Sequence, residues 1–502
     1  MATLLTGCFG GGKAAEPAAE GGALSHAAEG ALQACVAKLR GRGASPEAVA
    51  AFAANFRALA GSPAAGAGLV PEASIEPVAG LPRLADLGAA AAASKAEVAA
   101  LLGQAVVIKL NGGLGTSMGL QKAKSLLPVK AGKTFLDLMA EQVKTLRREY
   151  GAPVRFVLMN SFSTDADSLA ALAKKHPDLA REEDLVLMQG MSPKIGLEDL
   201  RPVEYPADPS LEWCPPGHGD IYPSLLGSGL LDRLLAAGVR YAFVSNSDNL
   251  GATMDLAILR HFAAEGHAFM MEVCERTEAD KKGGHLARRK RDGKLILRES
   301  AMCADADKEA FQDVGLHRFF NTNNLWLDLR QLKDKMAAAG GVLKLPVIRN
   351  KKTVNPRDPA TAKVYQLETA MGSAIENFEA SAAIVVPRAR FSPVKTCNDL
   401  FTLRSDAYEL TPDSRIVLAA AKAPLVKLDD KHYKLVDQME ALVRAYPSLK
   451  ACGSLTVEGP VKFGTGLLAG TSFAGDNKVT NADPAAPKAL PVKKYEDATV
   501  VL

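Results

Sequence analysis

Residues 105–125 read AVVIKLNGGLGTSMGLQKAKS. Residues 105–110 are apolar and rich in β-branched side chains, which predicts a buried strand. Four glycines follow within residues 111–119, and a loop without Cβ atoms lets backbone N–H groups point at an anion. Lys122 and Lys124 come next. The stretch therefore predicts a phosphate-binding loop at the end of a strand in a parallel sheet.

Two common nucleotide-binding patterns do not fit this loop. A dinucleotide-binding fingerprint needs G-x-G-x-x-G, but Met118 stands where the third glycine should be. A Walker loop needs Gly-Lys-Ser/Thr, which is missing here. The run from Gly7 to Lys13 starts like a Walker loop, but Ala14 replaces the required Ser or Thr, so we interpret it as a chance match. The plain alternative for residues 112–119 is a turn that only reverses the chain.

Composition excludes several classes of protein. The 502 residues are enough for two or three domains, and 60 basic against 56 acidic residues is too balanced for a nucleic-acid-binding protein. We find no apolar run of the ~20 residues that a membrane helix needs. Seven cysteines without C-x-x-C spacing argue against a disulfide scaffold or a zinc site, and they favour a reducing compartment. The N-terminus resembles neither a secretory signal nor a transit peptide, so we expect a cytoplasmic protein.

After residue 100, strand-like and helix-like patterns alternate, which predicts an α/β fold with a doubly wound, mostly parallel, Rossmann-like sheet. The predicted strands are Val154–Met159, Leu185–Met188, Tyr241–Ser245 and Phe269–Val273. The predicted helices are Phe135–Leu146, a helix from Ser163 or Thr164 to about Lys175, and Met254–Phe262. We expect a disordered tail (1–22), a helical N-terminal region and linker that pack on the main sheet (23–100), a large α/β domain (101–424) and a C-terminal β-helix (425–502).

The β-helix is predicted from residues 450–473. Short apolar runs separated by glycines recur there roughly every six to eight residues, as in stacked coils. Because such coils stack end to end, an exposed terminal coil would allow a homo-oligomer.

Polar clusters follow the predicted strands, at the edge of the sheet where ligands bind. Asp248 is a candidate Mg²⁺ ligand, because Mg²⁺ favours one or two carboxylates together with phosphate oxygens. An Asx-turn or a helix cap near Thr253 explains Asp248 equally well. His218 lies between two glycines, which allows close approach to a ligand and suits a neutral hydrogen-bond donor. Four consecutive polar residues at 321–324 interrupt a strand-like stretch and suggest a ligand pocket.

The run Lys109 to Gly119 resembles the UTP–glucose-1-phosphate uridylyltransferase (UDP-glucose pyrophosphorylase) family, eukaryotic type. Further segments with that resemblance follow in the family's order: Pro216-Gly-His-Gly-Asp, Asn246-Ser-Asp-Asn-Leu-Gly-Ala252, Phe320-Asn-Thr-Asn-Asn-Leu-Trp326, Gln366-Leu-Glu-Thr-Ala370 and the segment around Lys395. The resemblance covers about residues 100–410 and continues more weakly beyond. It implies a sheet of the GT-A type.

The resemblance also implies which residues bind the substrates. Leu110, Asn111, Gly112, Gly113 and Lys124 would hold the UTP phosphates, and Gln189 and Gly217 would read the uracil. The sugar phosphate would be bound by His218, Asn246, Ser247, Asp248, Asn323, Asn324, Leu325 and Glu368. Lys124 and Lys395 would be catalytic, with Lys395 stabilising the transferring phosphate, and Asp248 would carry Mg²⁺. One departure is that Lys122-Ala123 stands before Lys124 where the family has Gly-Pro, which leaves open which lysine points inward, and we favour Lys124.

The implied reaction transfers the uridylyl group of UTP to α-D-glucose 1-phosphate, reversibly and without a covalent intermediate, giving UDP-glucose and pyrophosphate. One alternative is a related uridylyltransferase for N-acetylhexosamine or other sugar 1-phosphates. Another is a nonenzymatic nucleotide-sugar sensor, which would be expected to lose the charged set of Lys124, Asp248 and Lys395. We also consider regulation by oxidation at Cys214 or Cys397, against the alternative that both are inert small residues.

Overall fold

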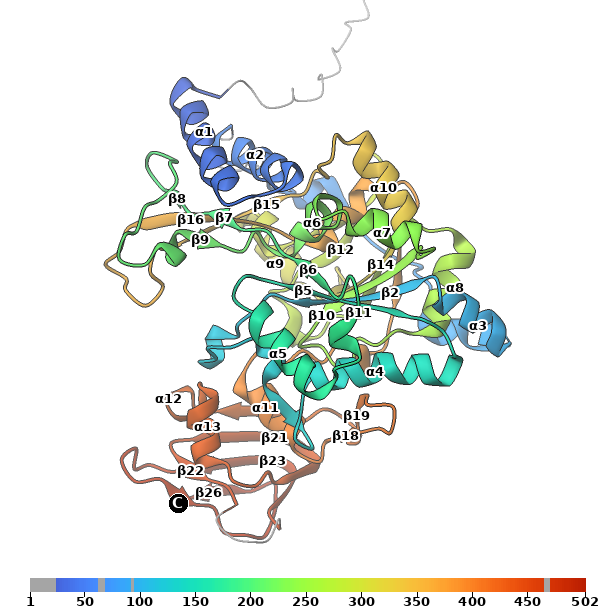
Figure 1. Ribbon diagram of the computed structural model, residues 1–502. Coiled ribbons are helices and arrows are strands. Elements are labelled where there is room, and N and C mark those ends of the chain that lie inside the picture. Colours follow the sequence, from blue (N-terminus) through green and yellow to red (C-terminus); the bar gives the residue numbers. More distant parts are fainter. Residues whose placement is uncertain (1–23, 62–67, 92–93, 465–469) are drawn as a thin grey trace, which may run out of the picture.

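The computed structural model describes residues 24–61, 68–91, 94–464 and 470–502. The predicted tail at residues 1–22, including the Walker-like match, lies outside them. Two N-terminal helices lie at the top of Figure 1, a large α/β body lies in the middle, and a strand-rich C-terminal region lies at the bottom. Among the described residues, no helix is long and apolar enough to cross a lipid bilayer.

A ten-stranded sheet forms the centre of the molecule. Its main path runs β1-β12-β14-β10-β2-β5-β6, and β11, β13 and β17 pair off this path. The strands are β1 (Ile75–Pro77), β2 (Ala105–Asn111), β5 (Arg155–Asn160), β6 (Val186–Met188), β10 (Tyr241–Asn246), β11 (Phe269–Glu275), β12 (His285–Arg289), β13 (Leu295–Arg298), β14 (Phe319–Asp328) and β17 (Ser381–Val385).

The sheet is mixed, which corrects the prediction of a mostly parallel one. The neighbours β10, β2, β5 and β6 are parallel, as the alternating pattern predicted. In contrast, β14 runs antiparallel to both β10 and β11. The chain from β11 to β14 is long enough for a crossover, but it forms the β12–β13 hairpin and short helical turns instead of one crossover helix, and β14 returns antiparallel beside β11.

Helices cover both faces of the sheet, so the doubly wound arrangement is confirmed (Figure 1). On one face Val107 and Phe243 pack against α4, α5 and α8, and on the other Val106 and Val244 pack against α6, α7 and α10. This alternation follows from the strand period of two residues. The helices are α4 (Phe135–Tyr150), α5 (Asp165–Lys175), α6 (Ile221–Gly227), α7 (Leu230–Ala236), α8 (Leu256–Glu265) and α10 (Leu329–Ala338).

The predicted N-terminal helices are present as α1 (His26–Gly41) and α2 (Pro46–Ala60), capped by Ser25 and Ser45. Their packing partner differs from the prediction. Phe52 and Phe56 of α2 belong to a cluster with Trp213 of β9 (Trp213–Cys214) and with Leu367, which lies in the small sheet of β8 (Ile195–Gly196), β15 (Val347–Thr353) and β16 (Lys363–Thr369). An amphipathic pattern identifies the buried face of a helix but not the surface that covers it.

The predicted linker also contributes to the main sheet. Within residues 68–91, β1 pairs with β12 and is followed by a 3₁₀ segment, η2 (Leu84–Ala91). The α3 helix (Lys95–Leu102) then leads into β2. β1 is thus an edge strand of the central sheet.

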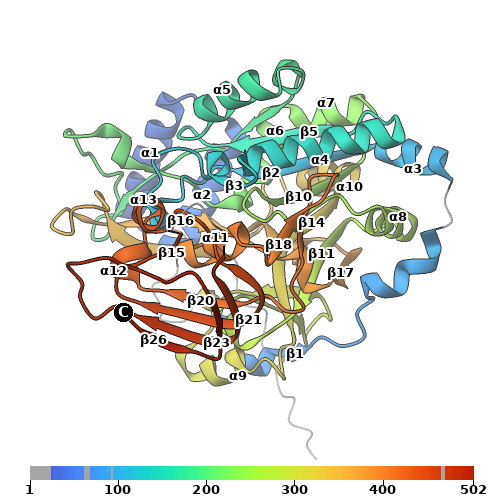
Figure 2. The same ribbon diagram turned by 90° about the horizontal axis from the view of Figure 1, so that it is seen from below.

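Parallel strands build the C-terminal region, where they lie side by side in chain order (Figure 2). They are β20 (Leu425–Leu428), β21 (Ser448–Glu458), β23 (Ser472–Thr480), β25 (Lys494–Glu496) and β26 (Thr499–Val501). Val457 of β21 pairs with Val479 of β23, which pairs in turn with Val500 of β26. The chain thus returns to the same position with each passage. Leu455, Phe463 and Phe473 are buried between the passages.

Candidate functional site

The glycine loop follows β2 and folds back on itself. Gly115 and Gly119 have φ angles of 70° and 78°, which favour glycine. The backbone N–H of Lys124 donates to the Gly113 carbonyl at 3.1 Å, so the chain after the loop returns beneath it. A Cβ on Gly113 would meet no heavy atom within 4 Å. The loop is thus open on the side of Gly113 and closed on the side of Lys124.

Lys124 and Asp248 meet at the carboxyl ends of β2 and β10. The Lys124 ammonium lies 2.7 Å from the Asp248 carboxylate, and the two side chains are only 13% and 18% exposed. Asp248 is placed there because β10 lies beside β2, and the Ser247 N–H donates to the Leu110 carbonyl at 3.1 Å. Lys122 is 73% exposed and lies 4.0 Å from Asp167. Lys124 is therefore the lysine that points inward.

Lys395 comes to the same edge on a loop after β17. The backbone of Asn249 pairs with Pro393, and the Val394 N–H donates to the Asp248 carbonyl at 3.2 Å. Burial raises the pKa of the Glu299 carboxyl, and the charge of Lys395 opposes that rise. Lys395 itself is exposed. The loop that carries Lys395 therefore lies directly against the loop that carries Asp248.

Gln189 lies beside the glycine loop, at the end of β6. Its side-chain amide donates to the Gly217 carbonyl at 2.9 Å, and a Cβ on Gly112 would lie 2.6 Å from its amide oxygen. Gly217 has a φ of 82°, and a Cβ there would lie 2.5 Å from the Thr369 carbonyl. Only glycine fits at position 217. Gln189 and Gly217 are thus neighbours, although 27 residues of sequence separate them.

His218 is held as a neutral hydrogen-bond donor. The Met371 N–H donates to its Nδ1 at 2.9 Å, so the proton of the neutral ring sits on Nε2. Burial lowers the pKa of His218 to about 4, which keeps the ring neutral at physiological pH. Nε2 lies 3.4 Å from the Asn323 amide nitrogen, and that nitrogen lies 3.4 Å from the Asn246 side-chain oxygen. Asn323 has a φ of 61°, which turns it out of the regular strand.

Several predicted site residues direct their side chains elsewhere. The Asn111 amide is buried and donates to Asn160 at 2.7 Å and to Ser168 at 2.9 Å. The Asn324 amide is also buried and donates to Glu272 at 3.0 Å, and Leu325 lies in the core. Asn111, Asn324 and Leu325 can therefore offer only their backbone to a ligand, whereas the Asn323 amide lies beside His218.

The other predicted residues lie at the same edge of the sheet or next to it. Ser247 is buried between Asn246 and Asp248. Glu368 lies on β16 next to Gly217, where a Cβ would approach the Glu368 Cβ to 3.0 Å. Its carboxylate accepts a hydrogen bond from the Asn350 amide at 2.9 Å.

Asp220 is a residue that the sequence argument quoted but did not use. Its buried carboxylate accepts from the Gly190 N–H at 2.6 Å and from the Ser224 hydroxyl at 2.7 Å. It therefore ties the residue after Gln189 to the turn that contains Gly217. Its position at the end of the Gly-His-Gly-Asp segment, residues 217–220, is the feature of the sequence that could have identified it as part of the site.

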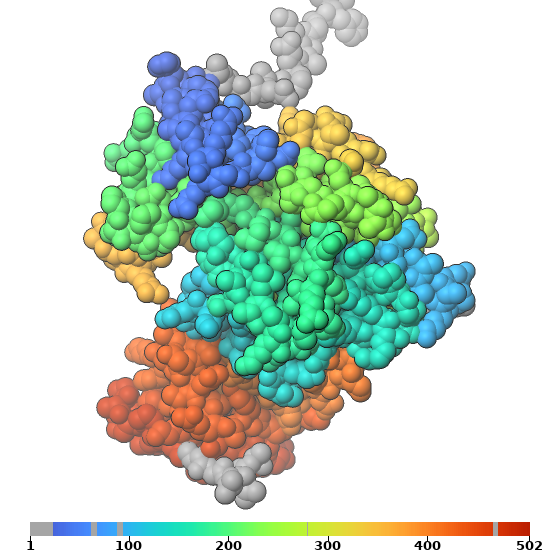
Figure 3. All heavy atoms as spheres, in the orientation of Figure 1, coloured from blue at the N-terminus to red at the C-terminus, as the bar shows by residue number. Residues whose placement is uncertain are grey.

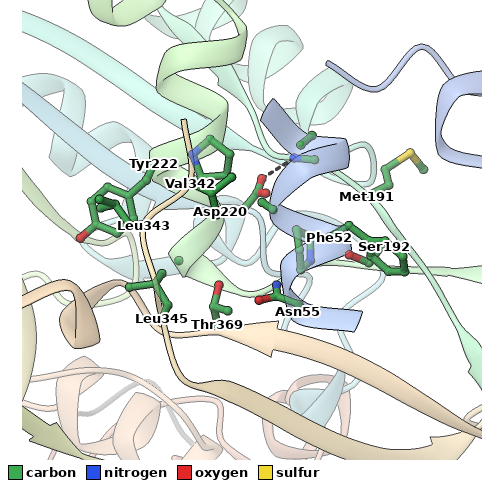
Figure 4. Close-up of a pocket in the computed structure, with 16 residues that line it drawn as sticks. Phe52, Asn55, Met191, Ser192, Asp220, Tyr222, Val342, Leu343, Leu345 and Thr369 are labelled. Atoms are coloured by element: carbon green, nitrogen blue, oxygen red, sulfur yellow. Dashed lines mark hydrogen bonds between the residues drawn. The ribbon is translucent and has the colours of Figure 1, made fainter. Parts of the chain in front are cut away.

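A cleft lies behind this turn (Figure 4). It is bounded by α2, residues 190–192, residues 216–223 and residues 342–345. Figure 4 shows Asp220 on its wall with the hydrogen bond to Gly190. The residues that line this cleft do not include Lys124, Asp248 or Lys395, so it is distinct from the predicted phosphate site. Figure 3 shows a second hollow, below the tip of the β15–β16 hairpin.

Asp220 should make the stability depend on pH. Burial raises the pKa of its carboxyl from 3.8 to about 6, against the opposing effect of its two hydrogen bonds. Between these values the folded chain keeps a proton that the unfolded chain loses, so the free energy of unfolding falls as the pH rises. From about pH 5 to about pH 7.5, we expect wild type to lose about 1 kcal/mol relative to Asp220→Asn. Urea denaturation of both proteins measures this, and a pH-independent difference would contradict it.

The cysteine hypothesis is not supported by the structure. Burial raises the pKa of the Cys214 thiol and of the Cys397 thiol to about 12. The Cys397 thiol donates to the Lys434 carbonyl at 3.3 Å. Because thiolates are the reactive form, two buried and protonated thiols have the character of inert packing residues.

Comparison with known proteins gives consistent matches. Residues 69–468 match the family model described as UTP–glucose-1-phosphate uridylyltransferase. The UTP–glucose-1-phosphate uridylyltransferase of Saccharomyces cerevisiae is 41% identical over 367 residues, which is 72% of each chain. A point mutant of the Leishmania major UDP-glucose pyrophosphorylase, solved with UDP-glucose, has a TM-score of 0.87 at 46% identity and covers 96% of this chain and 100% of its own. The UDP-glucose phosphorylase of Trypanosoma brucei has a TM-score of 0.84 at 47% identity, over 94% and 100%.

Proposed function

The chain belongs to the UTP–glucose-1-phosphate uridylyltransferase family, and we propose that the sheet edge at Lys124, Asp248 and Lys395 is its catalytic site. The enzyme transfers the uridylyl group of UTP to glucose 1-phosphate, giving UDP-glucose and pyrophosphate. One observation carries the placement of the site. The Lys124 ammonium and the Asp248 carboxylate meet at 2.7 Å below the glycine loop, and the Lys395 loop packs against Asp248.

The glycine loop would hold the triphosphate. Its backbone from Leu110 to Gly113 lies at the carboxyl end of β2, where the open side of Gly113 admits an anion. Lys124 pairs with Asp248 in the free chain, and in the complex its ammonium would turn to the phosphate oxygens. This exchange costs little electrostatic energy, because one negative partner replaces another.

The site fits Mg²⁺ held mainly by substrate. Among the described residues, no group of three or more His, Cys, Asp or Glu side chains is placed to hold a metal. Asp248 would supply one carboxylate oxygen, and phosphate oxygens would complete the coordination, which is the arrangement Mg²⁺ favours at nucleotide sites. When bound, the ion would neutralise charge on the phosphate oxygens.

The chain's own residues would then align an in-line displacement. A phosphate oxygen of glucose 1-phosphate forms a bond to the α-phosphorus of UTP, and the bond from that phosphorus to the bridging oxygen breaks as pyrophosphate leaves. Lys395 would face the transferring phosphate and stabilise the charge spread over its oxygens.

Specificity would come from two neighbouring groups of residues. Gln189 offers its amide to the uracil next to Gly217. His218 offers its Nε2–H to the sugar phosphate. The remaining sugar-phosphate contacts are assigned to Asn246, Ser247, Asp248, Asn323, the backbone of Asn324 and Leu325, and Glu368.

We further propose that residues 425–502 form a β-helix and that residues 101–424 form the catalytic domain. The parallel stacking of β20, β21, β23 and β26 in chain order supports the β-helix. Among the described residues, β26 pairs on one side only, with β23, and this edge supports a homo-oligomer formed through that coil. Light scattering of wild type and Val501→Lys across a concentration series tests this.

A cytoplasmic location is supported by the unpaired state of every described cysteine.

The proposed function is tested by pyrophosphate release. With UTP, Mg²⁺ and glucose 1-phosphate we expect steady release, and with N-acetylglucosamine 1-phosphate we expect much less. Equal or faster release with the N-acetylhexosamine would favour the related uridylyltransferase. No release with either sugar phosphate would favour a sensor without enzymatic activity.

A direct displacement predicts that no nucleotidyl-enzyme forms. Labelled pyrophosphate should therefore enter UTP only when glucose 1-phosphate or UDP-glucose is present, because the reverse reaction needs the complete product. Incubation of the enzyme with UTP, Mg²⁺ and labelled pyrophosphate measures this. Exchange in the absence of both glucose 1-phosphate and UDP-glucose would show a covalent intermediate instead.

A further inference from the structure

Asn249 connects the two loops that carry the proposed catalytic charges. Its amide nitrogen donates to the Arg390 carbonyl at 3.0 Å and approaches the Asn324 side-chain oxygen at 3.3 Å. Its side-chain oxygen accepts from the Ser392 N–H at 3.0 Å. The side chain is buried. One side-chain amide therefore joins the loop of Asp248 to the backbone just before Lys395. Both its nitrogen and its oxygen take part in this connection.

A buried ion pair between Arg390 and Glu272 stabilises this connection. The Arg390 guanidinium binds the fully buried Glu272 carboxylate through two hydrogen bonds, of 2.8 Å and 2.7 Å. Asn324 and Trp326 donate to the same carboxylate, each at 3.0 Å. Arg390 also donates to the Thr253 carbonyl at 2.9 Å, so its guanidinium contacts the chain just after the Asp248 loop. A bidentate pair with satisfied oxygens has little freedom to shift.

The two loops are also in direct contact. A Cβ on Gly251 would lie 2.2 Å from the Ala389 carbonyl, so the backbones approach as closely as glycine allows. At its far end the Asp248 loop is tied to β2, because the buried Lys109 ammonium donates to the Ala252 carbonyl at 2.6 Å. Strand β2, the Asp248 loop and the Lys395 loop are thus joined through one polar network.

We propose that Asn249 is a positioning residue for uridylyl transfer, which fixes the Lys395 loop relative to Asp248. This inference rests on the proposed function of those two residues. A transferring phosphate must be within reach of both charges at once, and small displacements of catalytic groups cost large factors in rate. Asn249 itself needs no contact with substrate. Aspartate cannot replace it, because it would lose both donors and place a negative charge near two oxygen acceptors.

The test compares Asn249→Ala with Asn477→Ala. Asn477 is a matched control in the C-terminal region, because its buried amide also makes three hydrogen bonds, to the Ala474 and Gly475 carbonyls and from the Ala498 N–H. Both variants should lose similar thermal stability. We expect kcat to fall about 10- to 100-fold in Asn249→Ala alone, with the KM for UTP changed less than kcat. Unchanged kcat in Asn249→Ala, or an equal fall in both variants, would overturn the proposal.

A double-mutant cycle tests whether Asn249 acts through Lys395. In a Lys395→Ala background, the further effect of Asn249→Ala on kcat should shrink to about threefold or less, because the group it positions is gone. Independent, multiplying effects would overturn the proposal. Full activity of Lys395→Ala alone would instead overturn the proposed role of Lys395, on which this inference rests. If Asn249→Ala does not fold, Asn249→Ser, which keeps a hydroxyl at this position, replaces it in both experiments, with a smaller fall in kcat expected.

Discussion

Replacing Lys124 by alanine is expected to lower kcat/KM by about 30- to 1,000-fold, as when a preorganised charge that faces the transition state is removed. The expectation rests on its position. Lys124 is mostly buried, it is the inward lysine of the loop, and its ammonium is aligned by Asp248 at 2.7 Å. Without it, the charge of the triphosphate and of the leaving pyrophosphate would be balanced only by the metal and Lys395. Steady-state kinetics with UTP and glucose 1-phosphate measures the loss.

Lys122 provides the matched control for this experiment. It lies two residues away in the same loop and carries the same charge, but its side chain is 73% exposed. Its nearest carboxylate, that of Asp167, lies at a distance of 4.0 Å from the ammonium. An exposed pair of this kind contributes little, so Lys122→Ala should stay within about twofold of wild type. If Lys122→Ala were the impaired variant and Lys124→Ala were active, the loop would be oriented differently with substrate bound.

Lys395→Ala is expected to lower kcat by a similar factor, about 30- to 1,000-fold. Lys395 lies on the loop whose Val394 N–H donates to the Asp248 carbonyl. Its proposed role is limited to the transferring phosphate, so kcat should fall more than the affinity for UTP. Isothermal titration with UTP, together with kcat, separates the two effects.

Lys427→Ala is the control for Lys395→Ala. Lys427 is an exposed lysine on β20, in the C-terminal region, so its removal changes the net charge equally without touching the site. Near-wild-type kcat is expected for this variant. Wild-type turnover in Lys395→Ala would mean that the transferring phosphate is stabilised by other groups.

The sequence was sufficient to predict the framework of the site. The strands β2, β5, β6 and β10 were recognisable because buried parallel strands are continuous apolar runs. Their carboxyl ends meet at one edge, which placed Asp248 beside the glycine loop. The inward lysine could not be derived from local pattern alone, because the direction of the chain after the loop depends on left-handed turns at Gly115 and Gly119.

The direction of the polar side chains on β14 was beyond local reasoning. Asn323 has a positive φ, and this breaks the alternation that would otherwise decide which side chains face a ligand. Asn324 turns instead to Glu272, a partner on β11 that no spacing in the sequence indicates. The antiparallel direction of β14 was missed for a related reason, since the pattern of residues 269–319 gives strands but not their pairing.

The most direct test of the central claim is a crystal structure of the chain with UTP and Mg²⁺. We expect the Lys124 ammonium to leave Asp248 and to lie about 3 Å from a phosphate oxygen, with the Asp248 carboxylate on the metal and Lys395 facing the α-phosphate. A complex in which Lys124 remains paired with Asp248 while the triphosphate binds elsewhere would contradict the account.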